Sequence, residues 1–222
     1  MPKFLILLFC LFSEVAISQE VDEPDIADLL QQGAWAFSNG NLELSERCFA
    51  RIAVLDSTHT TALYNLGIIR LEQFDTIGSI KYFQRSVQFG DRKAADVIKN
   101  VLNQKLELPE YFDFTKVDSP AYFTYEGRDI VFGIQNFVFS NLLKEKLKKL
   151  HSLKTVQKHG NFIVNLKIDK YGKMQCTVVR TIVSDDIAAE IVKIIENLVH
   201  FKPALFFGEP VGVGTYGLPI VI

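Results

Sequence analysis

The C-terminal sequence EPVGVGTYGLPIVI places Gly212, Gly214 and Gly217 at the G-x-G-x-x-G spacing of a dinucleotide-binding loop. In such a loop the glycines follow a strand and open a helix, whose N-terminus holds the pyrophosphate. Here the glycines fall within a segment that has the pattern of a strand, and no helical pattern follows them. We therefore expect no nucleotide site, and we interpret the glycines as a bulge or as a close approach of another backbone.

No other catalytic or metal-binding pattern is found in the sequence. There is no nucleophile elbow, no H-E-x-x-H and no P-loop pattern. Two adjacent acids, Asp185 and Asp186, suit the start of a helix better than a catalytic pair. We predict that the protein is not an enzyme and holds neither a metal ion nor a small-molecule cofactor. The side chains without metal-ligand spacing are His59, His151, His159, His200, Cys48 and Cys176.

The composition limits the function only loosely. The chain has 222 residues and a net charge of −2, which gives no electrostatic argument for binding nucleic acid. Its length allows one large domain or two small ones. Three cysteines are too few for a disulfide scaffold. Cys48 and Cys176 are expected to be buried thiols, with a bridge between modules as the alternative.

The N-terminal sequence MPKFLILLFCLFSEVAISQE has the pattern of a signal peptide. Its apolar run, residues 4–12, is much shorter than the roughly 20 residues that span a bilayer. Small residues at the spacing that signal peptidase accepts precede Gln19. Residues 1–18 are therefore predicted to be a cleaved signal peptide of a periplasmic protein. The alternative is an uncleaved N-terminus that anchors the chain in the inner membrane.

The first half of the chain contains an internal repeat with a period of 34 residues, which is typical of helix-turn-helix repeats. Small residues recur where paired helices approach each other, and phenylalanines recur beside them. The segment ALYNLGIIRLEQFDTIGSIKYFQRSV resembles the tetratricopeptide (TPR) family. We expect two repeats and a capping helix over residues 26–107, with the cap in DRKAADVIKNVLNQKLEL. The matching pairs are Gly33 and Gly67, Ser45 and Ser79, and Phe49 and Phe83.

In such repeats the first helix of each pair lines the concave face of the stack. That face would either bind a peptide in a groove or pack against the second half of the protein. Both alternatives stay open at this point. By position, the face would carry Leu30, Ala34, Phe37, Thr61, Tyr64, Ile68, Leu71 and Glu72.

Pro109 ends the helical region, and residues 111–139 are rich in aromatic side chains. We expect these to pack in a core or between modules, because too few basic residues interleave with them for a base-stacking surface. The segment NLLKEKLKKLHSLKTVQK then has leucines at helical spacing and lysines on the other face. That lysine face is predicted to be solvated, with an acidic partner or a lipid surface as the alternative.

Beyond residue 160 the hydrophobic period changes from that of a helix to that of strands. NFIVNLKID and MQCTVVRTI alternate around a hairpin turn, with Gly172 where a positive φ is needed. Ser184 is predicted to cap a helix that runs to Val199, and Pro203 stops it. The segment VGTYGLPIVI then forms a last strand. This order predicts a small α+β module with an antiparallel sheet.

The second module resembles the C-terminal domain of the TonB family over about residues 115–222. The resemblance rests on GNFIVNLKIDKYGKM, FKPALFFGEPV and TYGLPIVI. It implies that a partner segment, such as one from an outer-membrane transporter, adds as a strand to an edge of the sheet. The alternative is that the last strand only completes the core. The candidate edge residues are Val211, Val213, Thr215 and Tyr216.

The chain departs from TonB in two ways. KKLHSLKTVQ replaces the Tyr-Pro and Ala usual in the first helix, and TPR repeats stand where TonB has a membrane anchor and a Pro-rich spacer. The fold expected is TPR repeats over 26–107 followed by a TonB-like α+β domain within 108–222. The function expected is a periplasmic adaptor of TonB-linked outer-membrane transport that binds a protein partner by strand addition. The alternative is a TPR scaffold of an envelope complex with the second module as a docking unit.

Overall fold

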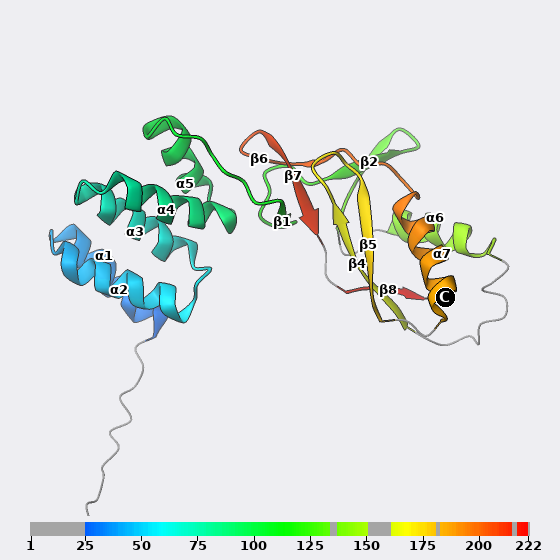
Figure 1. The fold of residues 1–222 in the computed structure, drawn as a ribbon, viewed down its shortest axis with the longest axis horizontal. Helices are drawn as coiled ribbons and strands as arrows, with labels where there is room; N and C mark the ends of the chain where they lie inside the picture. Colours follow the sequence, from blue (N-terminus) through cyan, green and yellow to red (C-terminus); the bar gives the residue numbers. More distant parts are fainter. Residues whose placement is uncertain (1–24, 134–136, 151–160, 181–182, 215–216, 222) are drawn as a thin grey trace, which may run out of the picture.

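The computed structural model describes residues 25–133, 137–150, 161–180, 183–214 and 217–221. It contains a helical module followed by an α+β module (Figure 1). The signal-peptide prediction falls on residues outside the described ranges. None of the described helices is long and apolar enough to cross a membrane. The helical module consists of α1 (Ile26–Ser38), α2 (Leu42–Leu55), α3 (Thr60–Glu72), α4 (Thr76–Gln88), α5 (Arg92–Asp96) and the π-helical turn η1 (Val97–Val101).

Polar side chains cap the starts of these helices. Asn41 accepts a hydrogen bond from the backbone N–H of Leu44 (3.0 Å), and Asp75 accepts one from Gly78 (2.8 Å). The two caps are 34 residues apart and sit at equivalent positions of the hairpins α1–α2 and α3–α4. The period seen in the sequence therefore corresponds to two helix hairpins.

Each hairpin is closed by a glycine on its first helix and a phenylalanine on its second. A Cβ at Gly33 would lie 3.0 Å from the ring of Phe49, and one at Gly67 would lie 2.6 Å from the ring of Phe83. The glycines thus let the paired helices approach until the rings fill the space between them. Both phenylalanines are fully buried.

The capping helix, formed by α5 and η1, is shorter than predicted. It ends at Val101, whereas the sequence pattern predicted a cap continuing toward Leu108. Asn103 adopts a left-handed backbone (φ 52°), and Gln104 N–H donates to the carbonyl of Ile98, which together end the helix. Residues 103–110, here called the linker, form neither helix nor strand and lead to the second module.

The α+β module is built on a mixed six-stranded sheet rather than the antiparallel one predicted. Its order is β1-β7-β4-β5, with β6 on β7 and β8 on β4, and the pair β1–β7 is parallel. The predicted last strand is split, and both parts pair with β4. The strands are β1 (Tyr111–Asp113), β4 (Asn161–Ile168), β5 (Met174–Arg180), β6 (Ala204–Phe206), β7 (Glu209–Gly214) and β8 (Leu218–Val221).

The predicted alternation in the central hairpin is confirmed where it is described. Val164, Leu166 and Ile168 of β4 are buried, and Gly172 has a φ of 83° in the turn to β5. The other face of β4 and β5 is half-buried or exposed, with Lys167 and Gln175 next to each other across the pair. One face of the sheet thus meets the core and the other is open.

Two helices complete the core side of the module. They are α6 (Phe137–Leu147), which starts earlier than the leucine pattern predicted, and α7 (Asp185–Glu196), which ends three residues before Val199. A separate hairpin of β2 (Tyr122–Tyr125) and β3 (Arg128–Val131) bridges to Lys202. The aromatic stretch supplies core side chains, as predicted: Phe112, Phe123, Phe132 and Phe139 are buried.

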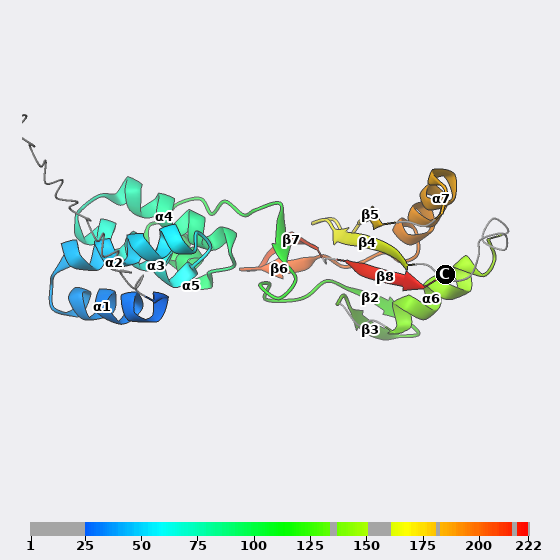
Figure 2. The same ribbon diagram turned by 90° about the horizontal axis from the view of Figure 1, so that it is seen from below.

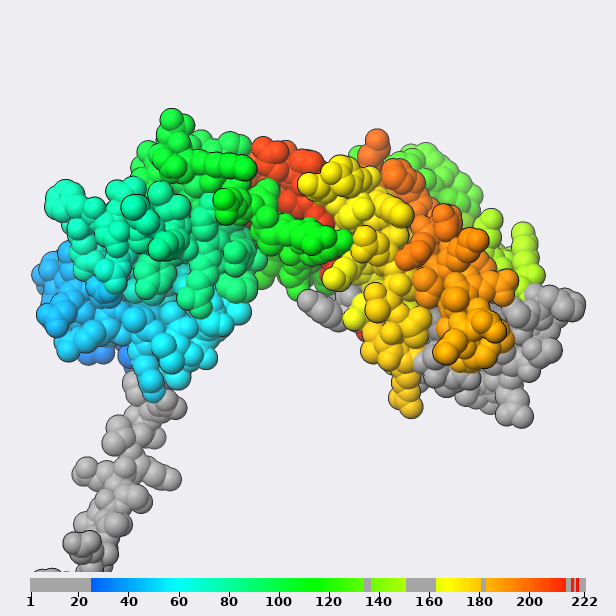
Figure 3. All heavy atoms as spheres, in the orientation of Figure 1, coloured from blue at the N-terminus to red at the C-terminus, as the bar shows by residue number. Residues whose placement is uncertain are grey.

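The two modules share one hydrophobic cluster, which runs from Phe83 and Ile98 in the helices to Phe112 and the sheet. A second, smaller cluster around Phe49 belongs to the first hairpin alone. In a view turned by 90° from Figure 1, the helical module and the sheet of the α+β module lie side by side along the long axis (Figure 2). The waist between them is formed by the linker, β1 and the β6–β7 hairpin (Figure 3). These segments therefore determine how the modules are joined.

Candidate functional site

The edge of β7 that was predicted to be free is occupied by the protein's own strand β1. Val213 lies between Phe112 of β1 on one side and Ile168 of β4 on the other. The prediction that Val211 and Val213 form a free edge is therefore wrong. Their side chains are buried in the core, and the backbone beside them is paired. Thr215 and Tyr216 lie outside the described residues.

Gly212 allows β1 to lie on this edge, whereas a Cβ at Gly214 would meet Lys167 of β4 and not β1. A Cβ at Gly212 would lie 2.6 Å from the carbonyl oxygen of Glu110 and 2.6 Å from the ring of Tyr111. Such contacts are far inside van der Waals distance, so only glycine fits there. The interpretation of these glycines as a close approach of another backbone is thereby confirmed for Gly212.

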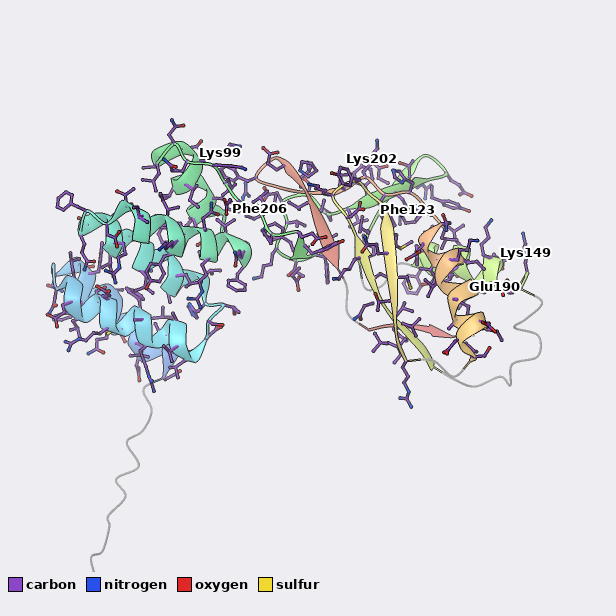
Figure 4. All side chains as sticks on the ribbon, viewed as in Figure 1. Lys99, Phe123, Lys149, Glu190, Lys202 and Phe206 are labelled. Carbon is purple, nitrogen blue, oxygen red and sulfur yellow. The ribbon has the colours of Figure 1, made fainter. Side chains whose placement is uncertain are left out.

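Phe112 anchors β1 in the core. Its side chain is only 4 % exposed and stacks on Phe206 with 4.6 Å between the ring centroids. Phe206 lies at the junction of the modules, near Lys99 (Figure 4). Stacked aromatic pairs add to the burial of apolar area. The three-residue strand is thus held by one inserted ring as well as by its ladder.

Tyr111 extends from β1 across the open face of the sheet. Its hydroxyl donates to Oε1 of Gln175 (3.3 Å), and Nζ of Lys167 lies 4.7 Å from its ring centroid. Burial, followed by the nearby Glu110 carboxylate, raises the pKa of the Tyr111 hydroxyl above its usual value. The hydroxyl therefore stays protonated at neutral pH and can donate. β1 consequently contacts both faces of the sheet and four of its strands, β4, β5, β6 and β7.

The opposite edge of the sheet, β5, is partly closed as well. Its Cys176 N–H donates to Oε1 of Glu196 at the end of α7 (3.0 Å). Burial, together with that carboxylate, raises the pKa of the Cys176 thiol to about 12. Cys176 and Cys48 are both free thiols, so no bridge joins the modules. A partner strand at β5 would have to displace Glu196.

The edge at β8 contains Pro219, which has no N–H to offer to an added strand. Among the described residues β8 pairs with β4 alone. Prolines on edge strands are one way in which proteins prevent unwanted pairing. The position best suited to hold an additional strand is therefore the one that β1 occupies.

A groove of about 970 Å³ runs beside β1, between the linker and the turns β4–β5 and β6–β7. Its walls carry charges of both signs, and Nζ of Lys99 lies 3.7 Å from Oε1 of Glu209. Lys170, also in the wall, lies over the ring of Tyr171. Apolar side chains of the linker and of β7 also line it, namely Leu106, Leu108, Pro109 and Val211. The groove thus continues the strand-accepting edge toward the helical module.

The predicted concave face of the helical module is largely filled. Tyr64, Ile68 and Leu71 are half-buried and pack against the cluster that the two modules share. The ring of Tyr64 lies 5.5 Å from that of Phe83. Phe37 packs against the smaller cluster, while Thr61 and Glu72 are exposed. The interpretation that this set packs is favoured over an open peptide groove.

The described residues bring together no group of three or more histidine, cysteine or acidic side chains that could hold a metal ion. His59 instead caps α3, where its Nδ1 accepts from Ala62 N–H (3.3 Å). Asp185 and Asp186 lie in the first turn of α7, as predicted. His151 and His159 lie outside the described ranges.

Comparison of the chain with protein-family models, with curated proteins and with solved structures found no match.

Proposed function

We propose that the protein is a periplasmic adaptor that binds an extended segment of a protein partner by strand addition at the outer edge of β7. The observation that supports this is the parallel pairing of β1 with β7, in the register Tyr111 with Gly212 through Asp113 with Gly214. The edge already holds a short strand, which directly follows the linker and forms the end of the sheet order. Recognition of this type uses main-chain hydrogen bonds, with alternate side chains giving specificity.

In this proposal β1 is the resident occupant, and the partner segment replaces it. A tethered segment competes at an effective concentration of the order of millimolar. The partner must therefore bind more tightly than β1, or β1 must first be weakened. The linker makes exchange feasible, because its residues 105–110 form neither helix nor strand and most of them line the groove.

The site defines the sequence of a suitable partner segment. The position equivalent to Phe112 requires an aromatic side chain, since it enters a buried site against Phe206. The preceding position lies over Gly212, and a tyrosine there reaches Gln175 and Lys167. We infer a segment with two adjacent aromatic residues, of which the second is buried.

The setting of this adaptor is inferred from the sequence patterns. The helix hairpins with their 34-residue period are inferred to be TPR repeats, and the second module a TonB-like domain. A signal peptide at residues 1–18 would deliver the chain to the periplasm, where a segment of a TonB-dependent outer-membrane transporter is the partner of choice. The competing proposal, a TPR scaffold, is supported by the exposed side chains of Phe74 and Ile77.

A peptide of residues 108–115, LPEYFDFT, tests the exchange. A fluorescent form would be titrated with the wild-type protein and with Phe112→Ala, in which β1 loses its anchor. We expect at least about tenfold tighter binding by Phe112→Ala, because the internal competitor is weakened. The matched control is the peptide with alanine at the second aromatic position, which should bind neither protein.

A cross-link between β1 and β7 supplies the converse test. Neighbouring strands are about 4.8 Å apart, which is compatible with a disulfide between Asp113→Cys and Gly214→Cys. The oxidised protein should bind no peptide, and reduction should restore binding. Equal binding by the oxidised, reduced and Phe112→Ala proteins would show that the peptide does not use this edge. Phe112→Leu, a milder change, covers the case in which the alanine variant does not fold.

A further inference from the structure

The turns of the two helix hairpins have the same backbone structure. In the first, Gly40 N–H donates to the carbonyl of Phe37 and Asn41 N–H to that of Ala36, at 3.0 and 2.9 Å. In the second, the equivalent bonds from Phe74 and Asp75 measure 2.9 and 2.8 Å. Both turns place one residue in the left-handed region, at φ 74° and φ 63°. This is the usual way of ending a helix with glycine.

The residue in that left-handed position is glycine in one hairpin and phenylalanine in the other. A bulky side chain at positive φ is strained, and nothing in the fold requires it here, since Gly40 makes the same turn. The Phe74 side chain is 95 % exposed, so no packing offsets the strain. A strained and exposed aromatic residue is explained more readily by a contact outside the chain.

A second apolar side chain lies three residues further on. Ile77, in the first turn of α4, is 71 % exposed, and its equivalent in the first hairpin is Glu43. Acidic residues flank this exposed pair, Phe74 and Ile77, with exposed Glu72 before it and Asp75 inside it. Such a surface suits an apolar site with a basic rim.

A site with these properties lies on the α+β module. A groove of about 500 Å³ between α6 and α7 is lined by Ile194 and Leu198, with Lys146 and Lys193 beside them. Glu190 and Asn197 complete its lining. Further lysines of α6 and the following turn lie at the same end, where Lys149 and Glu190 are labelled in Figure 4. The hairpin α3–α4 lies at the other end of the long axis (Figure 1).

We propose that the exposed pair of one molecule docks into the α6–α7 groove of a second copy, which gives a head-to-tail association. Phe74 and Ile77 enter the groove against Ile194 and Leu198, and Glu72 lies toward the lysines. Because the two surfaces differ and lie at opposite ends, the contact is heterologous and extends to further copies. This proposal does not depend on strand addition at β7.

The contact is small compared with a standard interface, in which each partner buries about 800 Å². Two side chains and their neighbours give a weak and reversible association, with a dissociation constant of the order of 10⁻⁴ M. Its ionic component makes it weaken as salt is raised. An anionic membrane is the less suitable occupant, because the acidic residues around Phe74 would be repelled by it.

Sedimentation equilibrium of the mature protein, from about 10 µM to about 1 mM, tests the proposal. We expect the mean mass to rise with concentration, and the association constant to fall at least about tenfold in Phe74→Gly. Phe74→Gly is expected to fold, since glycine already occupies the equivalent position 40. Ile77→Glu, which copies Glu43, should have the same effect.

A charge exchange identifies the groove. Glu72→Lys and Lys193→Glu should each weaken association, and the double variant should recover it. A monomer at every concentration overturns the proposal, as does association that Phe74→Gly leaves unchanged. If association is not recovered in the double variant, the docking site does not include Lys193, and the proposal is contradicted in that case too. Binding to phosphatidylcholine vesicles that is lost in Phe74→Gly, with the protein monomeric throughout, would assign the exposed pair to a membrane instead.

Discussion

The hairpins α1–α2 and α3–α4 have the same internal design and different surfaces. Inside, glycine faces phenylalanine in both, and a serine one turn earlier on the second helix is buried in both. At the tips, Gly40 and Glu43 of the first hairpin are replaced by Phe74 and Ile77 in the second. The repeated positions are those that the fold requires. The positions that differ are therefore free for function or for contact with the rest of the molecule.

The buried phenylalanines give the largest expected effect. Phe49→Ala and Phe83→Ala should each lower the free energy of unfolding by about 3–5 kcal/mol. The two variants should differ in how much of the protein they destabilise. Phe83 belongs to the cluster shared with the sheet, and Phe49 belongs to the smaller one. Native-state hydrogen exchange of the β4 amides should accelerate in Phe83→Ala only. Equal acceleration in both variants would mean that the hairpins are not energetically distinct.

Replacing the glycine that faces the buried phenylalanine should lower the stability more in the second hairpin than in the first. Gly67→Ala puts a methyl group 2.6 Å from the Phe83 ring, and overpacking of this kind costs about 1–3 kcal/mol. Gly33→Ala meets the Phe49 ring at 3.0 Å, a contact that a small shift relieves. There the gain of about 1 kcal/mol in helix propensity roughly offsets the strain. Urea unfolding should rank Gly67→Ala well below Gly33→Ala, and the opposite order would contradict the packing described.

Replacing the two buried serines by alanine should change the free energy of unfolding in different directions. Ser45 donates its hydroxyl to the carbonyl of Gly33 (2.9 Å), so Ser45→Ala should cost about 1 kcal/mol. Ser79 Oγ is buried without a hydrogen-bond partner among the described residues. Ser79→Ala removes that unsatisfied group and should be neutral or stabilising. Thermal unfolding of the two variants measures the difference, and a loss of stability in Ser79→Ala would reveal a partner for its hydroxyl.

The tip residues give the smallest effect, and a stabilising one. Phe74→Gly relieves a left-handed backbone at a bulky residue and should raise the stability by up to about 1 kcal/mol. Gly40→Ala, the reverse change in the first hairpin, should lower the stability by a similar amount. Chemical denaturation of both variants measures the pair. If Phe74→Gly destabilises the protein, the exposed phenylalanine has a structural role and the reason for treating it as a docking residue disappears.

Much of the fold could be predicted from local pattern. The spacing of Gly67 and Phe83 gave the helix hairpin, and alternation in NFIVNLKID with Gly172 gave the β4–β5 turn. The end of the capping helix α5–η1 was missed, because residues 103–107 have helical composition and the left-handed Asn103 follows the end of the helix at Val101. The candidate edge was wrong at Val213 for a different reason. Main-chain pairing leaves few side-chain signals, and the three-residue β1 is too short to show a period.

The sequence by itself determined the local structure: the helix hairpins with their caps, the strand turn at Gly172, and the change from helical to strand periodicity. These depend on residues within a few positions of one another. Only the tertiary structure decided which backbone closes the edge of β7. That pairing joins Tyr111–Asp113 to residues about a hundred positions away. It depends on the close approach of β1 at Gly212 and on the buried site of Phe112 against Phe206, which exist only once strands distant in sequence have packed together.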